Sequence, residues 1–197
     1  MPFKNLEEGG SAAKVETLFQ IQEALYQQSG FNKDLKPNLR LFNSIMSVFA
    51  RSNDIKKSKR AKRILDKMQA ADDVEPDTIT YYLVLKACAN TRGDAEESLE
   101  AFQIALDTLN DFRARFGTDS RCFSMFLRAC GNLMPPSRKR DAVIQSIFQK
   151  CCDDGLVSEF VLREFGRSSS EELQLQVLGG FLEDGVRLPK GWTRNVT

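Results

Sequence analysis

The sequence predicts an all-α protein, an α-solenoid of tandem helix-turn-helix repeats with about three full repeats and partial units at both ends. Two independent markers recur along the chain. Three helical segments align without gaps on aromatic residues at positions 42, 81 and 123. Residues suited to begin a helix stand at positions 38, 77, 119 and 158, at separations of 39, 42 and 39. Two helices in each unit of about 40 residues would stack as a superhelix of helical hairpins.

The aligned segments share one apolar helical face. They begin at Phe42, Tyr81 and Phe123, and in each segment apolar residues stand three and four positions after the aromatic residue. An apolar or thiol residue stands at plus seven, and a small residue, such as Gly131 in the third segment, stands at plus eight. This spacing is one face of an α-helix. The small residue predicts a close crossing with a neighbouring helix.

The predicted N-cap residues divide the chain into units. Asn38, Asp77, Asp119 and Ser158 carry side-chain oxygens that can accept hydrogen bonds from the free backbone N–H groups of a helix start. A proline precedes the first two and ends the previous helix. The predicted repeats are residues 38–76, 77–118 and 119–157.

Apolar residues at helical spacing predict the second helix of each unit, over 54–71, 95–116 and 138–153. Residues 1–37 contain one more amphipathic stretch, interpreted as the second helix of a partial repeat, so that the array begins mid-unit. Residues 158–197 are expected to form a degenerate half-repeat, a capping helix and a tail. A capping box at Ser169-x-x-Glu172 would start that last helix, and Gly179-Gly180 would end it.

Composition argues against several classes of function. Lysine and arginine number 28 against 27 acidic residues, so any contact with nucleic acid must come from a local face. The chain has no histidine, which removes the commonest general base, and its five cysteines lack metal-ligand spacing. The cysteines are interpreted as small core residues. We expect no enzyme, catalytic residue, metal, cofactor or small-molecule substrate. No membrane span is expected either, because no apolar run approaches the ~18–20 residues required.

Two charged segments have plain interpretations. Residues 1–14 contain Glu7 and Glu8 and fit neither a signal peptide nor an arginine-rich transit peptide. The basic run Lys56–Arg63 resembles an RNA-binding patch. However, it lies on a second helix, which faces outward in a solenoid, so a solvated surface is the favoured interpretation.

Residues 38–158 resemble the pentatricopeptide repeat family. Units of this family have a first helix with an aromatic–Asn pair, an Ala-rich second helix ending in Met, and then Pro-Asp. In this chain the corresponding strings are Phe42-Asn43, Ala61 to Met68, Glu75-Pro76-Asp77 and Thr78-Ile-Thr-Tyr81. The units here are longer than those of the family. The rival tetratricopeptide pattern is absent.

The resemblance implies binding of single-stranded RNA, about one base per repeat, in a groove lined by the first helices. Three positions in each unit would contact a base. Carried over, they are Arg40, Asn43 and Asp77; Ile79, Tyr82 and Asp119; and Arg121, Ser124 and Ser158. Asn43 with Asp77 resembles the family's pyrimidine-reading pair, with a preference for uracil, whereas Tyr82 would stack. Asp77 and Asp119 serve as N-caps in either case.

The resemblance therefore implies a non-catalytic RNA-binding repeat protein of the kind that acts in organellar RNA processing, stability or translation, in a mitochondrion or plastid. Three units would bind RNA weakly alone, or act with protein partners. The alternative is a protein-binding α-solenoid scaffold or adaptor, favoured by the near-zero net charge and by the unusual readers Tyr82 and Ser124. A nuclease related to such repeats would need a separate metal-binding domain, and residues 158–197 are not expected to form one. A positive groove on the first helices would favour RNA over a protein ligand.

Overall fold

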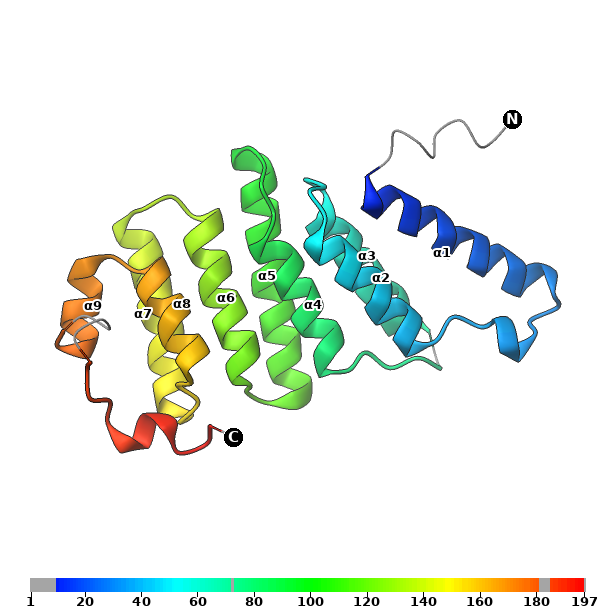
Figure 1. The fold of residues 1–197 in the computed structure, drawn as a ribbon. Helices are drawn as coiled ribbons and strands as arrows, with labels where there is room; N and C mark the ends of the chain where they lie inside the picture. The colour runs from blue at the N-terminus through cyan, green and yellow to red at the C-terminus, as the bar shows by residue number, and fades with distance from the viewer. Residues whose placement is uncertain (1–9, 72, 181–184, 197) are drawn as a thin grey trace.

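A computed structural model describes residues 10–71, 73–180 and 185–196 (Figure 1). Its α-helices are α1 (Ser11–Gln28), α2 (Leu39–Arg51), α3 (Lys57–Ala70), α4 (Thr78–Ala89), α5 (Ala95–Phe116), α6 (Ser120–Leu133), α7 (Arg138–Asp153), α8 (Glu159–Ser168) and α9 (Glu171–Leu178). Short 3-10 helices η1 and η3 span Lys33–Leu35 and Lys190–Thr193. The described residues contain no strand, so the predicted all-α class is confirmed. Residues 1–9, which bear on the expected lack of a targeting peptide, lie outside this description.

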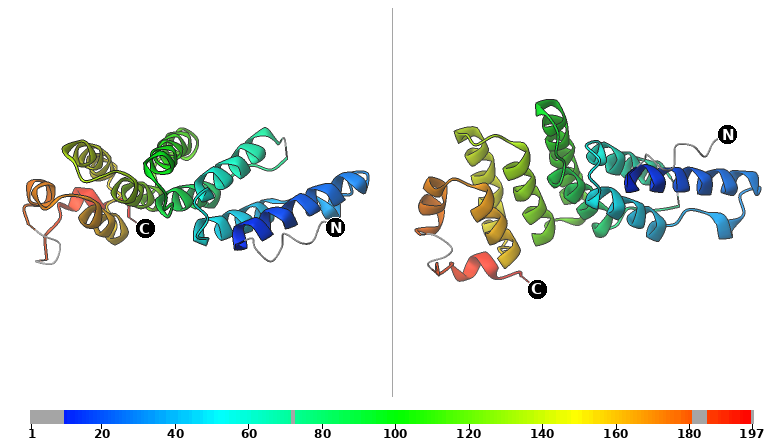
Figure 2. Two further views of the ribbon diagram at one scale, coloured as in Figure 1. Left: turned by 90° about the horizontal axis from the view of Figure 1, so that it is seen from above. Right: turned by 45° about the horizontal axis from the view of Figure 1, so that its top comes forward.

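The helices form two layers along the array. Seen from above, α2, α4, α6 and α8 make one layer, and α3, α5 and α7 make the other (Figure 2). Consecutive first helices pack on one another, and each second helix packs against the first helices of its own unit and the next. This is the arrangement of a helical-hairpin solenoid. None of the helices in the described parts of the chain is both long and apolar enough to cross a membrane.

All four predicted N-caps are confirmed. Asn38, Asp77 and Ser158 each accept a hydrogen bond from the backbone N–H three residues later, and Asp119 accepts from two such groups. Asp77 and Thr80 form a capping box, because the backbone N–H of Asp77 also donates to Oγ1 of Thr80 at 3.1 Å. These contacts satisfy donors that a helix start leaves unpaired. They fix the starts of α2, α4, α6 and α8 at the predicted positions, and the division of the chain into repeats there stays a prediction.

The aligned apolar faces meet in one continuous core. Its largest fully buried side chains include Phe49, Tyr81, Phe112, Phe126 and Phe148. The second helices lie close to the predicted ranges, and the 22-residue α5 accounts for the greater separation between Asp77 and Asp119. All five cysteines are reduced and buried, as predicted. Burial raises the pKa of each thiol, so the cysteines pack as neutral core groups.

Close packing of α6 on α8 depends on Gly131. A Cβ placed on this residue would lie 2.8 Å from Cβ and 3.1 Å from the backbone Cα of Ser168. Both distances are shorter than ordinary carbon–carbon contact. The predicted close crossing at the small residue is therefore confirmed.

Two asparagines connect neighbouring repeats. Nδ2 of Asn90 donates to the backbone oxygen of Ala50 at 2.9 Å, and Nδ2 of Asn132 donates to that of Ala89 at 2.6 Å. Both acceptors lie in the last turn of a first helix, where carbonyl groups have no partner within the helix. Each asparagine thus caps the first helix of the preceding repeat.

The N-terminal α1 covers the end of the α2–α3 hairpin. Its Phe19 ring packs edge-on against Phe42, with the ring centroids 5.4 Å apart. Its Glu16 carboxylate forms ion pairs with Arg60 and Arg63 of α3. The amphipathic helix predicted here exists, and its origin as the second helix of a partial repeat stays a prediction.

The start of α9 differs from the prediction by one residue. Ser170, not Ser169, caps this helix, and its Oγ accepts from the N–H of Leu173 at 3.2 Å. The Ser169 hydroxyl instead donates to the Phe165 carbonyl at 2.7 Å, and this carbonyl also accepts from the Ser169 backbone N–H at 3.0 Å, so Ser169 closes the end of α8. Gly179 ends α9 in a left-handed conformation with φ of 73°, as predicted.

The basic run on α3 lies largely at the surface, as expected, but one of its lysines is buried and most of its charges are paired. Lys57 is buried, and its ammonium group donates to the backbone oxygens of Ser52 and Asn90. Most of the other cations on this helix form ion pairs with acidic residues. These pairs are Lys59 with Glu100, Arg60 with Asp54 and Glu16, Lys62 with Asp66, Arg63 with Glu16, and Lys67 with Glu23. Most of these acidic residues lie on the neighbouring helices α1 and α5, so the sequence of α3 by itself could not predict the ion pairs.

Candidate nucleic-acid interface

The layer of first helices carries two adjoining grooves. The α2–α4 groove has a volume of about 640 Å³, and the α4–α8 groove, which also contacts α6, has a volume of about 510 Å³. Ile79 lines both of them. Among the predicted base-contacting residues, Arg40, Asn43 and Asp77 line the first groove, and Tyr82, Asp119, Arg121 and Ser124 line the second. The structure therefore brings eight of the nine together on one face.

Ser158 lines neither groove. It is 8% exposed, and its hydroxyl oxygen accepts from the backbone N–H of Val161 as the cap of α8. Ser124 is 2% exposed, and its hydroxyl donates to the Arg121 carbonyl at 2.8 Å. Contact of these two residues with a base stays a prediction.

A hydrogen-bond network holds Asn43 at the floor of the α2–α4 groove. Nδ2 of Asn43 lies 3.2 Å from a carboxylate oxygen of Asp77, and Oδ1 of Asn43 lies 2.8 Å from the Thr80 hydroxyl. The same Asp77 oxygen accepts from the Thr80 N–H at 2.8 Å. A carboxylate can only accept, so it selects the amide nitrogen of Asn43 and sets which way the amide faces. This hydrogen-bond network therefore joins α2 to the start of α4.

The network leaves part of the Asn43 amide available. An amide carries two N–H donors and two acceptor lone pairs, and the contacts to Asp77 and Thr80 use one of each. The side chain is half-buried in the groove. One donor and one acceptor therefore remain, in a fixed orientation, for the edge of a base.

The pKa of Asp77 lies below the ordinary value of an aspartate. Burial would raise this pKa, but hydrogen bonds from the Thr80 backbone N–H and from Asn43 outweigh that effect and lower it. The negative charge strengthens the hydrogen bond that orients Asn43. Asp77 thus acts both as the cap of α4 and as the group that positions Asn43.

The grooves are rich in cations without acidic partners. Six basic side chains line them: Arg40, Arg51, Lys86, Arg121, Arg128 and Arg163. In the parts of the chain that the structure describes, only Arg163 of these six forms an ion pair, with Glu164 at 3.5 Å. The two carboxylates in the grooves, Asp77 and Asp119, are both held by helix N–H groups. The layer of first helices therefore carries local positive charge on a nearly neutral chain.

The site also contains Lys86, Arg128, Phe160 and Arg163, which the sequence reasoning missed. The repeat alignment contained a signal for all of them. Lys86 and Arg128 stand five positions after the aligned aromatic residues, one helical turn beyond Tyr82 and Ser124. Phe160 and Arg163 stand two and five positions after Ser158, at the spacing of the base-contacting positions in the other units. Extending the alignment past Ser158 would have found them.

Residues 31–91 match the family model of the pentatricopeptide repeat domain. This segment is a pentatricopeptide repeat domain. It contains α2, α3 and α4 and therefore the whole Asn43–Asp77–Thr80 network. No curated protein and no solved structure matched the chain. Beyond residue 91, the caps and stacked helices described above continue as further helical hairpins.

The described residues offer no metal site. Within those ranges, no group of three or more cysteine, aspartate and glutamate side chains is placed to hold a metal ion. The chemistry available in the grooves is hydrogen bonding, stacking and attraction of negative charge.

Proposed function

We propose that this chain is a non-catalytic repeat protein that binds single-stranded RNA along the grooves of its first helices. The observation that carries the proposal is the distribution of cations. Basic side chains on the outer helix α3 are largely paired with acids, whereas five of the six groove cations are not, in the part of the chain that the structure describes. Unpaired cations in a concave surface attract phosphate groups.

Base selection is assigned to the first unit. Asn43, oriented by Asp77, presents one donor and one acceptor, which matches the edge of a pyrimidine. Arg40 and Ile79 lie beside it in the α2–α4 groove and can pack on the base face. The family resemblance assigns uracil to this pair. With few reading positions, affinity in the micromolar range or weaker is expected, because the cost of association offsets most of the contact energy.

Fluorescence anisotropy with labelled homopolymers of about eight nucleotides tests this proposal, since such repeats read about one base each. We expect salt-sensitive binding, with oligo-U bound more tightly than oligo-A. Asn43→Ala should lower the preference for U about fivefold, the value of one hydrogen bond of about 1 kcal/mol. Asp77→Asn keeps a good N-cap but removes the charge that orients Asn43, so it should also weaken the preference.

Asn110→Ala is the matched control, because Asn110 is an exposed residue of the outer helix α5. Absence of salt-sensitive binding to every homopolymer would refute RNA binding. Equal loss of binding in Asn43→Ala and Asn110→Ala would refute the assigned reader.

A protein ligand is the second candidate. It is favoured by two apolar side chains in the α4–α8 groove, Ile79 and Phe160, which are 54% and 57% exposed. Recovery of one stoichiometric protein partner, together with no RNA crosslinked to the grooves, would favour this candidate over RNA.

A further inference from the structure

The α4–α8 groove differs in chemistry from the α2–α4 groove. Four cations line it, namely Lys86, Arg121, Arg128 and Arg163, against the single carboxylate of Asp119. That carboxylate is already engaged, because one of its oxygens accepts from the N–H groups of Arg121 and Cys122 at 2.8 and 3.0 Å. The groove favours phosphate groups because four cations outnumber the one carboxylate.

Two aromatic rings in this groove each lie beside a cation. The Lys86 ammonium lies 5.8 Å from the Tyr82 ring centroid, and the Arg163 guanidinium lies 5.0 Å from the Phe160 ring centroid. Every nucleobase can stack on an aromatic ring, whatever its edge. A base stacked on either ring would bring its own phosphate close to the neighbouring cation.

The α4–α8 groove lacks an equivalent of the Asn43–Asp77 pair. Tyr82 stands at the position of Asn43 in the second unit, and the half-buried ring offers a face instead of an amide edge. Ser124 stands there in the third unit, but it is buried and its proton goes to a backbone carbonyl. Neither group presents the paired donor and acceptor that distinguish one base from another.

We infer that the two grooves divide the work of binding single-stranded RNA. The α2–α4 groove selects one base, and the α4–α8 groove holds the adjoining nucleotides by their phosphates and by stacking, without regard to sequence. This inference rests on the proposed function and assigns Lys86, Phe160, Arg128 and Arg163 a role that does not depend on the identity of the base.

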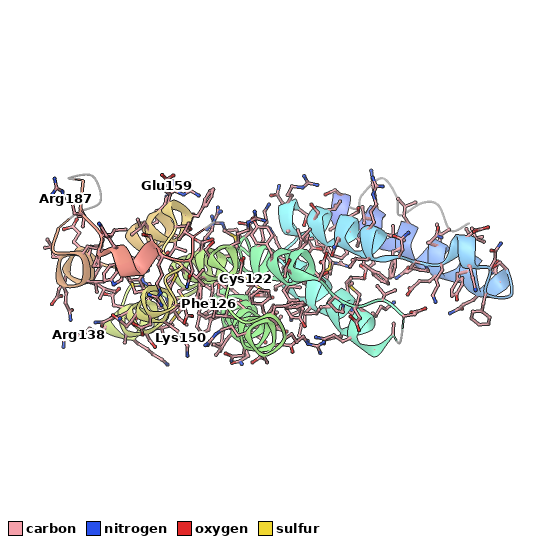
Figure 3. The ribbon with its side chains drawn as sticks, turned by 90° about the horizontal axis from the view of Figure 1, so that it is seen from below. Cys122, Phe126, Arg138, Lys150, Glu159 and Arg187 are labelled. Atoms are coloured by element: carbon pink, nitrogen blue, oxygen red, sulfur yellow. The ribbon has the colours of Figure 1, made fainter. Side chains whose placement is uncertain are left out.

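The test compares two triple variants of the full chain by anisotropy, with oligo-U, oligo-A and oligo-C probes over a range of salt concentrations. The groove variant is Lys86→Ala/Arg128→Ala/Arg163→Ala. The control variant, Arg138→Ala/Lys139→Ala/Lys150→Ala, removes the same charge from exposed positions on α7. Figure 3 places the labelled Arg138 and Lys150 on the α7 side of the molecule, opposite Glu159 at the start of α8.

We expect the groove variant to bind all three probes more weakly by the same factor, while the preference for U is unchanged. The slope of log affinity against log salt should fall by about 2, because each contact with a single-stranded phosphate contributes about 0.7. The control variant should keep the slope of the original chain. Tyr82→Leu/Phe160→Leu should weaken all three probes about tenfold, as expected for lost stacking.

The possible results separate the two proposals. If the original chain binds none of the probes, both the proposed function and this inference fail. If it binds oligo-U through Asn43 but the groove variant keeps the slope, or loses no more than the control, only the division between grooves is wrong. The division is also wrong if the groove variant or the aromatic variant weakens one probe much more than the others.

Discussion

Removal of the Asn132 amide should destabilise the stack at one repeat boundary. Its Nδ2 donates to the Ala89 carbonyl at 2.6 Å, and Ala89 is fully buried at the end of α4. In the described residues that carbonyl receives no backbone N–H. Asn132→Ala therefore leaves a buried acceptor unpaired, at a cost of about 1–3 kcal/mol. Since Asn132 itself lies at the surface, water can partly replace it, and we expect about 1–2 kcal/mol.

Urea unfolding followed by circular dichroism measures this loss as a lower midpoint at an unchanged slope. In thermal unfolding it should lower the Tm by about 2–8 °C, given 2–4 °C per kcal/mol for a chain of this size. Asn110→Ala is the matched control, because it makes the same change on a helix at an exposed site. It also corrects for the higher helix propensity of alanine.

Asn132→Asp sharpens the test. The carboxylate would direct an acceptor, with negative charge, at a carbonyl that lies at the negative end of the α4 dipole. We therefore expect Asn132→Asp to be less stable than Asn132→Ala by about 0.5–1 kcal/mol. The capping argument is refuted if Asn132→Ala matches Asn110→Ala, or if the aspartate variant is as stable as the alanine variant.

Three further predictions follow from the packing and the pKa shifts. Gly131→Ala should cost about 1–3 kcal/mol in urea unfolding, because its Cβ would overlap Ser168, whereas Gly10→Ala, with open space around it, should cost only the small difference between glycine and alanine at a helix N-cap. The pKa of Asp77 is lowered in the folded chain, so the stability that its charge contributes is present above the unfolded pKa and is lost as the pH falls through the folded pKa. The difference in unfolding free energy between the original chain and Asp77→Asn should therefore shrink in acid, and a difference that stays constant with pH would contradict this prediction. Burial and the hydrogen bond to Asp111 raise the pKa of Tyr81 to about 12, so the stability that this phenol contributes is lost as the pH rises from the unfolded pKa toward 12. In an ultraviolet titration of the folded protein, the phenolate step at the highest pH should therefore disappear in Tyr81→Phe. Retention of that step would show that another tyrosine produces it.

The layout of helices was largely predictable because the signals are local. A helix start needs an oxygen acceptor within one turn, so Asn38, Asp77, Asp119 and Ser158 act where the sequence places them. Ser169 shows the limit of this reasoning. Its hydroxyl could either cap the start of α9 or donate to a carbonyl at the end of α8, and in the folded chain it donates to the Phe165 carbonyl.

The candidate site was predictable only in part. The family resemblance named Asn43, Asp77, Tyr82 and Arg121, and the structure places them on one face, because equivalent positions of stacked units line up. The resemblance did not reveal that Ser124 lies buried, since that depends on the neighbouring helices that cover it.

The sequence by itself therefore determined the all-α class, the order of the helices and the caps of α2, α4, α6 and α8, since each depends on periodicity or on contacts within a turn. Only the tertiary structure decided which charges remain available. Lys57 is buried against carbonyl groups of two helices, and Arg60 is paired with Glu16 of α1, although both belong to the most basic run of the sequence. Lys86 and Arg128, which no sequence run singles out, have no acidic partner in the described parts of the chain and line the α4–α8 groove. A charge is neutralised only where the helix that packs beside it carries an acidic residue, and that residue can lie far away in the chain.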